Sequence, residues 1–202
     1  MDPQRARQPT MRLIDPKPDG WLRPLAERDI SALTATCQDP ESAEWTTVPL
    51  PYRTEDAVQF VRAIAPQMWS EGRGAIFAIS AADDAYCGTI DLRILATDPS
   101  AAEVGFMISP QARGQGFAPS ALKTLSVWGF KALGLQRIIW RAHVGNDSSR
   151  RVAVKAGFVY EGIQRSGVPH RGERRDAWVA SLLPSDLPAA LQQASFEIRT
   201  EA

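Results

Sequence analysis

The sequence predicts one α/β domain built on a mixed, mostly antiparallel sheet with helices on both faces. Three apolar, β-rich runs at residues 75–80, 87–95 and 103–108 are separated by turn residues, which is typical of an antiparallel meander. A helix expected at about 117–133 and a strand at 136–144 follow, so the third run opens a right-handed βαβ unit. At 202 residues the chain is long enough for one core, and we find no linker that divides it.

Composition excludes several classes of partner. The 23 basic and 23 acidic residues balance, so no global charge attracts nucleic acid or an anionic membrane. No apolar run approaches the ~20 residues of a membrane span, and the first residues lack the apolar stretch of a signal peptide, so we expect a cytoplasmic protein. Cys37 and Cys87 have neither metal-ligand nor redox spacing, so we expect reduced thiols and no metal.

The first third of the chain is predicted to hold a tail, a strand, a helix and a loop. Residues 1–19 contain four prolines among polar residues, which predicts a flexible N-terminal tail. A short strand at 21–25 and a helix from 26 to about 36 follow. Residues 40–53 contain three prolines and are predicted to form an irregular loop, whose aromatic residues Trp45 and Tyr52 either contact a substrate or pack.

A second helix is expected to begin at Thr54, and its core face to carry Val58, Val61, Ile64, Ala65 and Met68.

The last third is predicted to hold a short helix ending at Ala156 and an antiparallel pair of strands at 158–163 and 177–183. The connection between these strands is basic; it contains Arg165, His170, Arg171, Arg174 and Arg175. Such a loop is either a solvated face or a wall of a binding cleft. The predicted domain covers 20–186, and residues 187–202 form a C-terminal extension.

The turn that follows residue 108 carries the clearest chemical signal. Pro110 ends the strand, and Gly114 and Gly116 flank Gln115 immediately before a helix. Inward-facing amides, the positive end of the helix and the charge of Arg113 would together make an anion cradle. The glycine spacing only half-matches a dinucleotide fingerprint, and the lysine of a triphosphate loop is absent. The competing interpretation is a plain strand-to-helix turn.

A family resemblance narrows the choice of anion. Residues 111–116, QARGQG, match the Q/R-x-x-G-x-G/A pyrophosphate loop of GNAT-superfamily acyltransferases. The segment 103–186 resembles the RimJ/RimL type, through the features Val104-Gly105-Phe106, Asn146 with Ser149, Gly157-Phe158, Glu161-Gly162, and Gly172 with Asp176. The resemblance covers most of 20–186 and implies a GNAT-like sheet in which the βαβ unit carries the coenzyme A loop.

The resemblance also implies a cofactor site for acetyl-CoA. The loop residues expected there are Gln111, Arg113, Gly114, Gln115, Gly116, Phe117 and Ala118. A backbone N–H of Phe106, Met107 or Ile108 is expected to stabilise the thioester oxygen, because this strand splays from its neighbour in the family. Asn146 is expected to bind the pantetheine, unless it is only a helix cap.

Two catalytic residues are predicted with the resemblance. Glu103 precedes the loop where many GNAT enzymes have a base, although it could be an ordinary surface carboxylate. The acidic position that RimL-type enzymes use is Val168 here, so Glu103, a water or His170 would serve instead. Ala153 replaces a common tyrosine acid, which leaves Ser149 to hydrogen-bond the departing thiolate, unless it too is only a cap. His143 is expected to be structural.

Three functions are compatible with these residues. The first is acetyl transfer from acetyl-CoA to a protein N-terminus, the second is acetylation of a small-molecule amine or antibiotic, and the third is a non-catalytic acyl-CoA sensor. The acceptor is expected to contact Trp45, Tyr52, His170 and Arg171. A peptide would need an open groove there and a small amine a closed pocket. A homodimer is possible.

Overall fold

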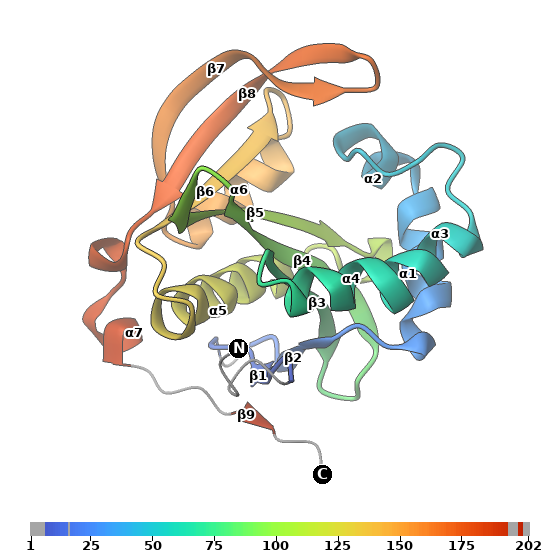
Figure 1. Cartoon of the computed structure of the whole chain (residues 1–202), viewed down its shortest axis with the longest axis horizontal. Coiled ribbons are helices and arrows are strands. Elements are labelled where there is room, and N and C mark those ends of the chain that lie inside the picture. The colour runs from blue at the N-terminus through green and yellow to red at the C-terminus, as the bar shows by residue number, and fades with distance from the viewer. Residues whose placement is uncertain (1–6, 16, 194–197, 200–202) are drawn as a thin grey trace.

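The computed structural model describes residues 7–15, 17–193 and 198–199 and shows a single twisted sheet across the molecule (Figure 1). The strands lie in the order β7-β8-β6-β5-β4-β3-β2-β1-β9. Their bounds are Thr10–Arg12 (β1), Gly20–Pro24 (β2), Gly74–Ala81 (β3), Tyr86–Leu95 (β4), Asp98–Ile108 (β5), Arg137–His143 (β6), Val159–His170 (β7), Glu173–Leu182 (β8) and Ile198–Arg199 (β9).

Helices cover both faces of this sheet. Their bounds are Ile30–Gln38 (α1), Pro40–Trp45 (α2), Thr54–Gln59 (α3), Ala65–Ser70 (α4), Phe117–Ala132 (α5), Asp147–Lys155 (α6) and Ala189–Gln193 (α7). Short turns at Glu27–Asp29 (η2), Phe60–Ile64 (η3), Pro110–Ala112 (η4) and Pro184–Asp186 (η5) complete them; η3 is a π-helical turn that joins α3 to α4.

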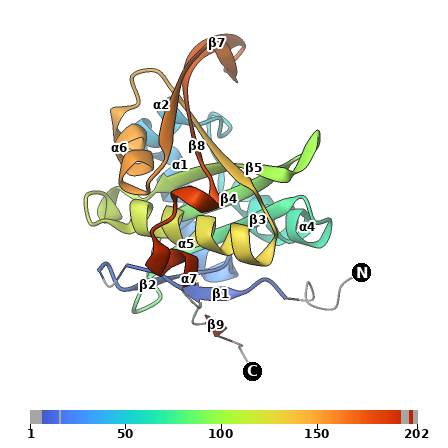
Figure 2. The same cartoon turned by 90° about the vertical axis from the view of Figure 1, so that its left-hand side faces the viewer.

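Side-chain contacts place α5 and α1 on opposite faces of the sheet. Trp128 of α5 packs edge-on against Phe77 of β3, with ring centroids 5.6 Å apart, and belongs to the main core. On the opposite face, Leu33 of α1 and Val61 of η3 form a second core cluster against Met107 of β5. Figure 2 shows α5 along the side of the sheet that faces the viewer in that orientation. The predicted sheet with helices on both faces is confirmed.

One pair of neighbouring strands is parallel. β5 and β6 run in the same direction on either side of α5, which confirms the predicted βαβ unit, and every other neighbouring pair in the described sheet is antiparallel. The parallel ladder is short: residues 101–104 pair with 137–140 and no later pair follows, although both strands continue. The sheet therefore opens between β5 and β6.

The prediction of a flexible tail over residues 1–19 is wrong for part of that segment. Met11 of β1 pairs with Leu22 of β2 and is fully buried, and Leu13 is 5% exposed. These apolar side chains cover the outer side of β2, which the proline content of the segment conceals. Residues 1–6 and 16 lie outside the described residues.

The irregular loop predicted over residues 40–53 contains a helix. Asp39 caps α2 by accepting from the Ser42 amide at 3.0 Å, and Pro40 occupies the first helical turn, where its missing N–H costs nothing. The helix that begins at Thr54 is confirmed, but its core face differs from the prediction. Ala57, Val61 and Ala65 are buried, whereas Ile64 is 40% exposed, because the π turn shifts the helical phase.

The basic connection predicted at residues 165–176 is itself strand. β7 and β8 stay paired out to His170 and Glu173, and the chain reverses at Arg171 and Gly172, which both have positive φ. We call the outer part of this hairpin, residues 164–177, the β7–β8 arm. Alternating exposed polar residues hide its strand character, because both sides of the arm lie largely outside the main core.

Candidate active site

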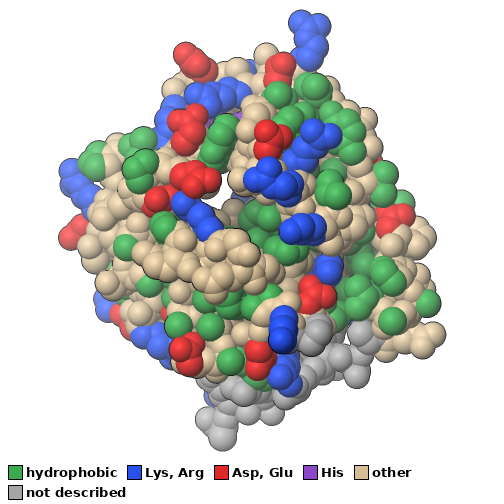
Figure 3. All heavy atoms as spheres, turned by 180° about the vertical axis from the view of Figure 1, so that it is seen from behind, with side chains coloured by type: hydrophobic (Ala, Val, Ile, Leu, Met, Phe, Trp, Pro, Cys, Tyr) green, Lys and Arg blue, Asp and Glu red, His purple; other side chains and the backbone are tan. Residues whose placement is uncertain are grey.

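A cavity of about 930 Å³ passes through the opening between β5 and β6. On one side of the sheet it is lined by the start of α5 and by α6, and on the other side by α1, α2, α3 and η3. Figure 3 shows the molecule hollowed near its centre, with acidic and basic side chains at the rim. We call the α5–α6 side the cofactor end and the α1–α3 side the acceptor end.

The loop at the cofactor end has the conformation that an anion cradle needs. Gly114 and Gly116 have φ of 76° and 88°, a region that side chains rarely adopt, and both line the cavity. Gly116 is the N-cap residue of the 16-residue α5, and no side chain caps this end. A Cβ on Gly114 would meet no atom within 4 Å, so the loop backbone borders open space. The helix amides are therefore available to a ligand in the cavity.

The side chains of this loop contribute less than the sequence suggests. Arg113 forms ion pairs with Asp39 and with Glu41, the latter at 2.7 Å, and also donates to Ser42 at 3.1 Å. Its charge is thus largely neutralised, and it joins the loop to α2. Gln115 donates to the Gln111 carbonyl oxygen at 2.6 Å, and neither glutamine lines the cavity. The cradle consists mainly of backbone.

The hydrogen-bond pattern of β5 shows which amides face the opening. The Ser109 amide donates to the oxygen of Cys87 on β4 at 2.9 Å. Because bonded pairs alternate in an antiparallel ladder, the amide of Met107 also faces β4, while those of Phe106 and Ile108 face β6. β6 is no longer paired there, so these two amides border the cavity. Of the three amides predicted as oxyanion donors, the register therefore favours Phe106 and Ile108.

The start of α6 brings the predicted Asn146 and Ser149 together. The Asn146 side chain caps the helix by accepting from the Ser149 amide at 3.0 Å. The Ser149 hydroxyl oxygen accepts from the indole N–H of Trp140 at 3.0 Å. A hydroxyl that accepts this bond keeps its own proton for another partner, and an accepted bond polarises the group toward donation. Asn146 and Ser149 both line the cavity, so the cap and the site coincide.

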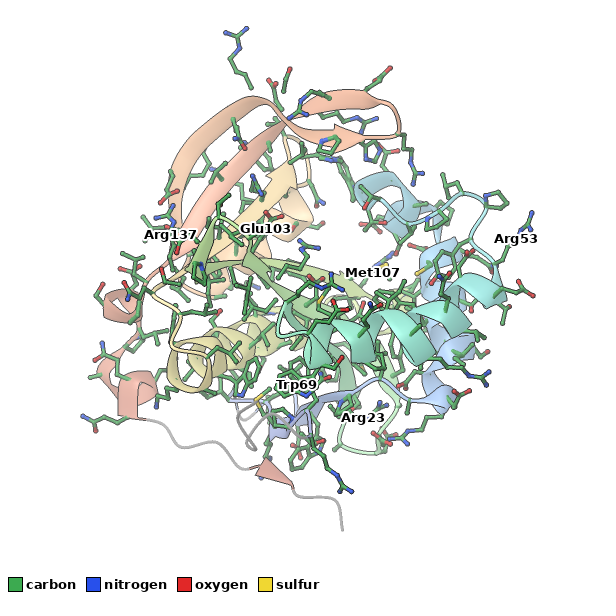
Figure 4. The ribbon with its side chains drawn as sticks, viewed as in Figure 1. Arg23, Arg53, Trp69, Glu103, Met107 and Arg137 are labelled. Carbon is green, nitrogen blue, oxygen red and sulfur yellow. The ribbon has the colours of Figure 1, made fainter. Side chains whose placement is uncertain are left out.

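A charged cluster crosses the sheet where the cavity passes through it. Glu103 lies in the middle of β5 (Figure 4) and forms ion pairs with Arg93, at 3.2 Å, and with Arg141. Both Arg93 and Arg141 line the cavity, as Glu103 does. The predicted base is therefore held between two guanidinium groups, which share its oxygens.

Sequence reasoning missed Asp91, a second carboxylate of this cluster. Asp91 lines the cavity and stands opposite Gly105 in the β4–β5 ladder. Burial raises its pKa to about 6, with the nearby Arg93 opposing and Glu103 adding to the rise. An isolated Asp inside an apolar strand carries no motif, so only the register reveals that it faces the cavity.

The acceptor end is formed by aromatic residues from distant parts of the chain. Trp45 of α2 lies 6.3 Å from the ring of His143 on β6, and His143 lies 4.5 Å from His170 on the β7–β8 arm. Tyr52 is buried in the second core cluster and also reaches the cavity, so it packs and borders the site at once. Burial lowers the pKa of both histidines. His170 is behind His143 and does not line the cavity.

The β7–β8 arm is attached to α2. Arg171 donates to the carbonyl oxygens of Ala43 at 2.8 Å and of Thr46 and Val48 at 3.4 Å. Arg175 forms an ion pair with Glu44 at 3.3 Å. These contacts close one wall of the acceptor end, and Arg171 holds that wall together. Arg171 itself does not line the cavity.

Comparison with known proteins agrees with this geometry. Residues 21–159 match the acetyltransferase (GNAT) domain family. The chain belongs to the GNAT family. It is 29% identical over 163 residues to the uncharacterised N-acetyltransferase YoaA of Bacillus subtilis, a match that covers 80% of this chain and 92% of that protein.

Solved GNAT structures share the fold. Mycobacterium smegmatis RimJ in complex with CoA-disulfide aligns with a TM-score of 0.77 at 20% identity, over 91% of this chain and 90% of that one. RimL, the ribosomal L7/L12 alpha-N-protein acetyltransferase in complex with coenzyme A, aligns with a TM-score of 0.73 at 17% identity, over 85% and 97%. The GNAT fold and N-acetyltransferase class that the sequence predicts are confirmed.

Within the described residues, no group of three or more His, Cys, Asp or Glu side chains is placed to hold a metal ion. The helices in the same part of the chain are all too short or too polar to span a bilayer.

Proposed function

We propose that this GNAT protein transfers the acetyl group of acetyl-CoA to a primary amine, with a protein N-terminus as the preferred acceptor. The observation that carries the proposal is the coincidence of an uncapped helix start, two left-handed glycines and two unpaired strand amides along one cavity. An acyl-CoA needs each of these groups, since it has a pyrophosphate, an amide-bearing arm and a thioester oxygen.

Each end of the cavity would perform one part of the reaction. The Gly114–Gly116 backbone and the start of α5 bind the pyrophosphate. The amides of Phe106 and Ile108 face the path of the pantetheine and the thioester, where one well-placed donor contributes about 3 kcal/mol to acyl transfer. Ser149 donates its free hydroxyl proton as a hydrogen bond to the departing sulfur.

The acceptor end is closed on one side, which disfavours a peptide that lies across a groove but still admits an amine at the end of a chain. The β7–β8 arm is joined to α2 by Arg171 and by the Arg175–Glu44 pair, so an acceptor enters end-on instead of lying across a groove. At pH 7 an α-amino group with a pKa of about 8 is roughly a tenth neutral, whereas a lysine is far less so. RimL, a fold neighbour, is named as an alpha-N-protein acetyltransferase.

A small-molecule amine is the second candidate. The same closed wall favours it, because a cavity of about 930 Å³ can enclose most of a drug-sized molecule. Microcin C7 self immunity acetyltransferase MccE, another fold neighbour, was solved with acetyl-CoA and AMP.

The test is release of free thiol from acetyl-CoA in the presence of acceptors. Peptides with N-terminal Ser, Ala or Met are compared with the same peptides blocked by N-terminal acetylation and with a panel of small amines. Turnover that requires the free α-amine establishes the preferred function. Turnover of amines alone selects the second candidate, and binding of acetyl-CoA without any turnover contradicts both.

A further inference from the structure

We propose that the carboxylate of Asp91, and not that of Glu103, accepts the proton of the attacking amine. This inference rests on the proposed function and assigns a role within the same site. It is carried by the position of Asp91 on the cavity wall, by the partial exposure of its carboxylate there, and by the ion pairs that hold Glu103.

The sheet register brings Asp91 to the point where the strands separate. Asp91 of β4 pairs with Gly105 of β5, one residue before Phe106, whose amide faces the opening. A Cβ on Gly105 would lie 2.9 Å from Asp91 Oδ1 and 3.3 Å from a guanidinium nitrogen of Arg93. Only glycine therefore leaves the carboxylate uncovered beside the predicted oxyanion donors.

The two carboxylates of the cluster differ in their partners. Glu103 accepts hydrogen bonds from Arg93 at 3.2 Å and from Arg141. Asp91 Oδ2 is buried 3.1 Å from a nitrogen of Arg93 and accepts no hydrogen bond within the described part of the chain. The Asp91 side chain as a whole keeps 22% of its surface exposed on the cavity wall. A base must have an oxygen free to take the proton, so the geometry favours Asp91.

The surrounding charges set the proton affinity of Asp91. Burial raises its pKa to about 6; Glu103 acts in the same direction and Arg93 against it. Arg141 from β6 and Asp56 from α3 also line this cavity. A carboxylate with a pKa of about 6 is ionised at neutral pH. This pKa is about two units below that of an α-amine but more than four units below that of a lysine. The site is therefore better matched to an α-amine.

The proposed step balances as follows. An ammonium group with three N–H protons loses one to Asp91, and the neutral nitrogen then bonds to the thioester carbon. The C–S bond breaks as the second proton leaves the nitrogen. One of the two protons ends on the CoA sulfur and the other is released to solvent from Asp91, so the products are the acetylated amine, CoA thiol and one proton.

The first experiment compares the pH dependence of kcat/KM in the wild type, Asp91→Asn and Glu103→Gln. The probe reaction is acetyl-CoA with an N-terminal Ser peptide. We expect Asp91→Asn to lower kcat about 10²- to 10⁴-fold and to remove a limb near pH 6, below which the wild-type rate falls. Glu103→Gln is expected to retain that limb. Repetition with peptides whose amine pKa differs assigns the limb, because an enzyme group titrates at the same pH with each.

Calorimetry of acetyl-CoA binding separates the two proposals. If the wild type turns over and Asp91→Asn is equally active, the assignment of Asp91 is overturned while the proposed function stands. If the wild type binds acetyl-CoA but acetylates no acceptor, both are overturned. Loss of acetyl-CoA affinity in Asp91→Asn comparable to its loss of kcat would show a structural role and also overturn the assignment.

A second measurement is independent of activity. Carboxyl carbons of the free protein labelled at aspartate are titrated by NMR, and the Asp91→Asn variant identifies the missing resonance. We expect that resonance to titrate near pH 6. Titration in the range of an ordinary aspartate, near 4, would overturn the proposal.

Discussion

The two ends of the cavity are built from different parts of the protein. At the cofactor end, the proposed binding groups are backbone amides of one continuous stretch, from the opening beside β5 through the Gly114–Gly116 loop to the start of α5. At the acceptor end, the walls are side chains of α2, β6 and the β7–β8 arm, which meet only in the folded chain. A backbone cradle tolerates changes in side chains, whereas the acceptor wall changes with each of them.

The largest effect is expected from a charge in the backbone cradle. Gly114→Asp puts a carboxylate into the open space beside the loop, and like-charge repulsion should weaken acetyl-CoA binding about 100-fold, as measured by calorimetry. Gly114→Asn is the matched control, because Asn has the same size and tolerates positive φ without the charge.

Gly134 offers a second control at the other end of α5. It also has positive φ, at 69°, and open space around its Cβ position. Gly134→Asp should leave acetyl-CoA affinity unchanged. Equal losses of acetyl-CoA affinity in Gly114→Asp and Gly134→Asp, or no loss in either variant, would remove the loop from the proposed site.

A smaller effect is expected where the two ends meet, at Ser149. Ser149→Ala removes the hydroxyl that accepts from Trp140 and donates to the sulfur, so kcat should fall about 10- to 100-fold, with little change in acetyl-CoA affinity. Ser149→Thr should restore part of the rate. Parallel losses of kcat and affinity would reduce Ser149 to a helix-cap residue.

The acceptor wall should respond more weakly and only toward the amine. Arg175→Glu breaks the exposed pair with Glu44 and places like charges together. Such pairs contribute about 0.2 to 1 kcal/mol, so the acceptor KM should rise up to about fivefold while acetyl-CoA affinity stays constant. The double variant Glu44→Arg, Arg175→Glu should recover the wild-type KM; without this recovery, the arm does not position the acceptor through this contact.

The smallest effect is a pH dependence of stability at the acceptor end. Burial lowers the pKa of His143 and His170 below the usual 6.5, so the unfolded chain binds protons that the folded chain does not. Their contribution to stability is therefore present above about pH 6.5 and falls as the pH drops below it. Urea midpoints at pH 7.5 and 5.5 measure the loss in the Asp91→Asn variant, because the raised pKa of Asp91 gives the opposite trend in this pH range. His170→Phe should reduce the difference between the two midpoints, because it removes one of the two titrating imidazoles. The fold should tolerate the change, since His170 Nδ1 has no hydrogen-bond partner to lose among the described residues.

The same contrast explains what the sequence could predict. The cradle is contiguous and requires glycine at Gly114 and Gly116, so residue types and spacing reveal it. Local signals also predicted the meander and α5. The length of the β7–β8 arm could not be predicted, because strands exposed on both sides lose apolar alternation. Met11 is buried because β2 lies beside it in the fold, which its own segment does not indicate. Asp91 reaches the cavity through the register of β4 against β5, which residue order does not specify.

The opening between β5 and β6 has a consequence for the exchange of backbone hydrogens with solvent. Successive amides of β5 face opposite ways, so Gly105 and Met107 are protected by β4, while Phe106 and Ile108 are open to water. Deuterium uptake should therefore alternate residue by residue along a strand whose ribbon looks uniform. Addition of acetyl-CoA should slow exchange at the two open amides alone, and the alternation would then disappear.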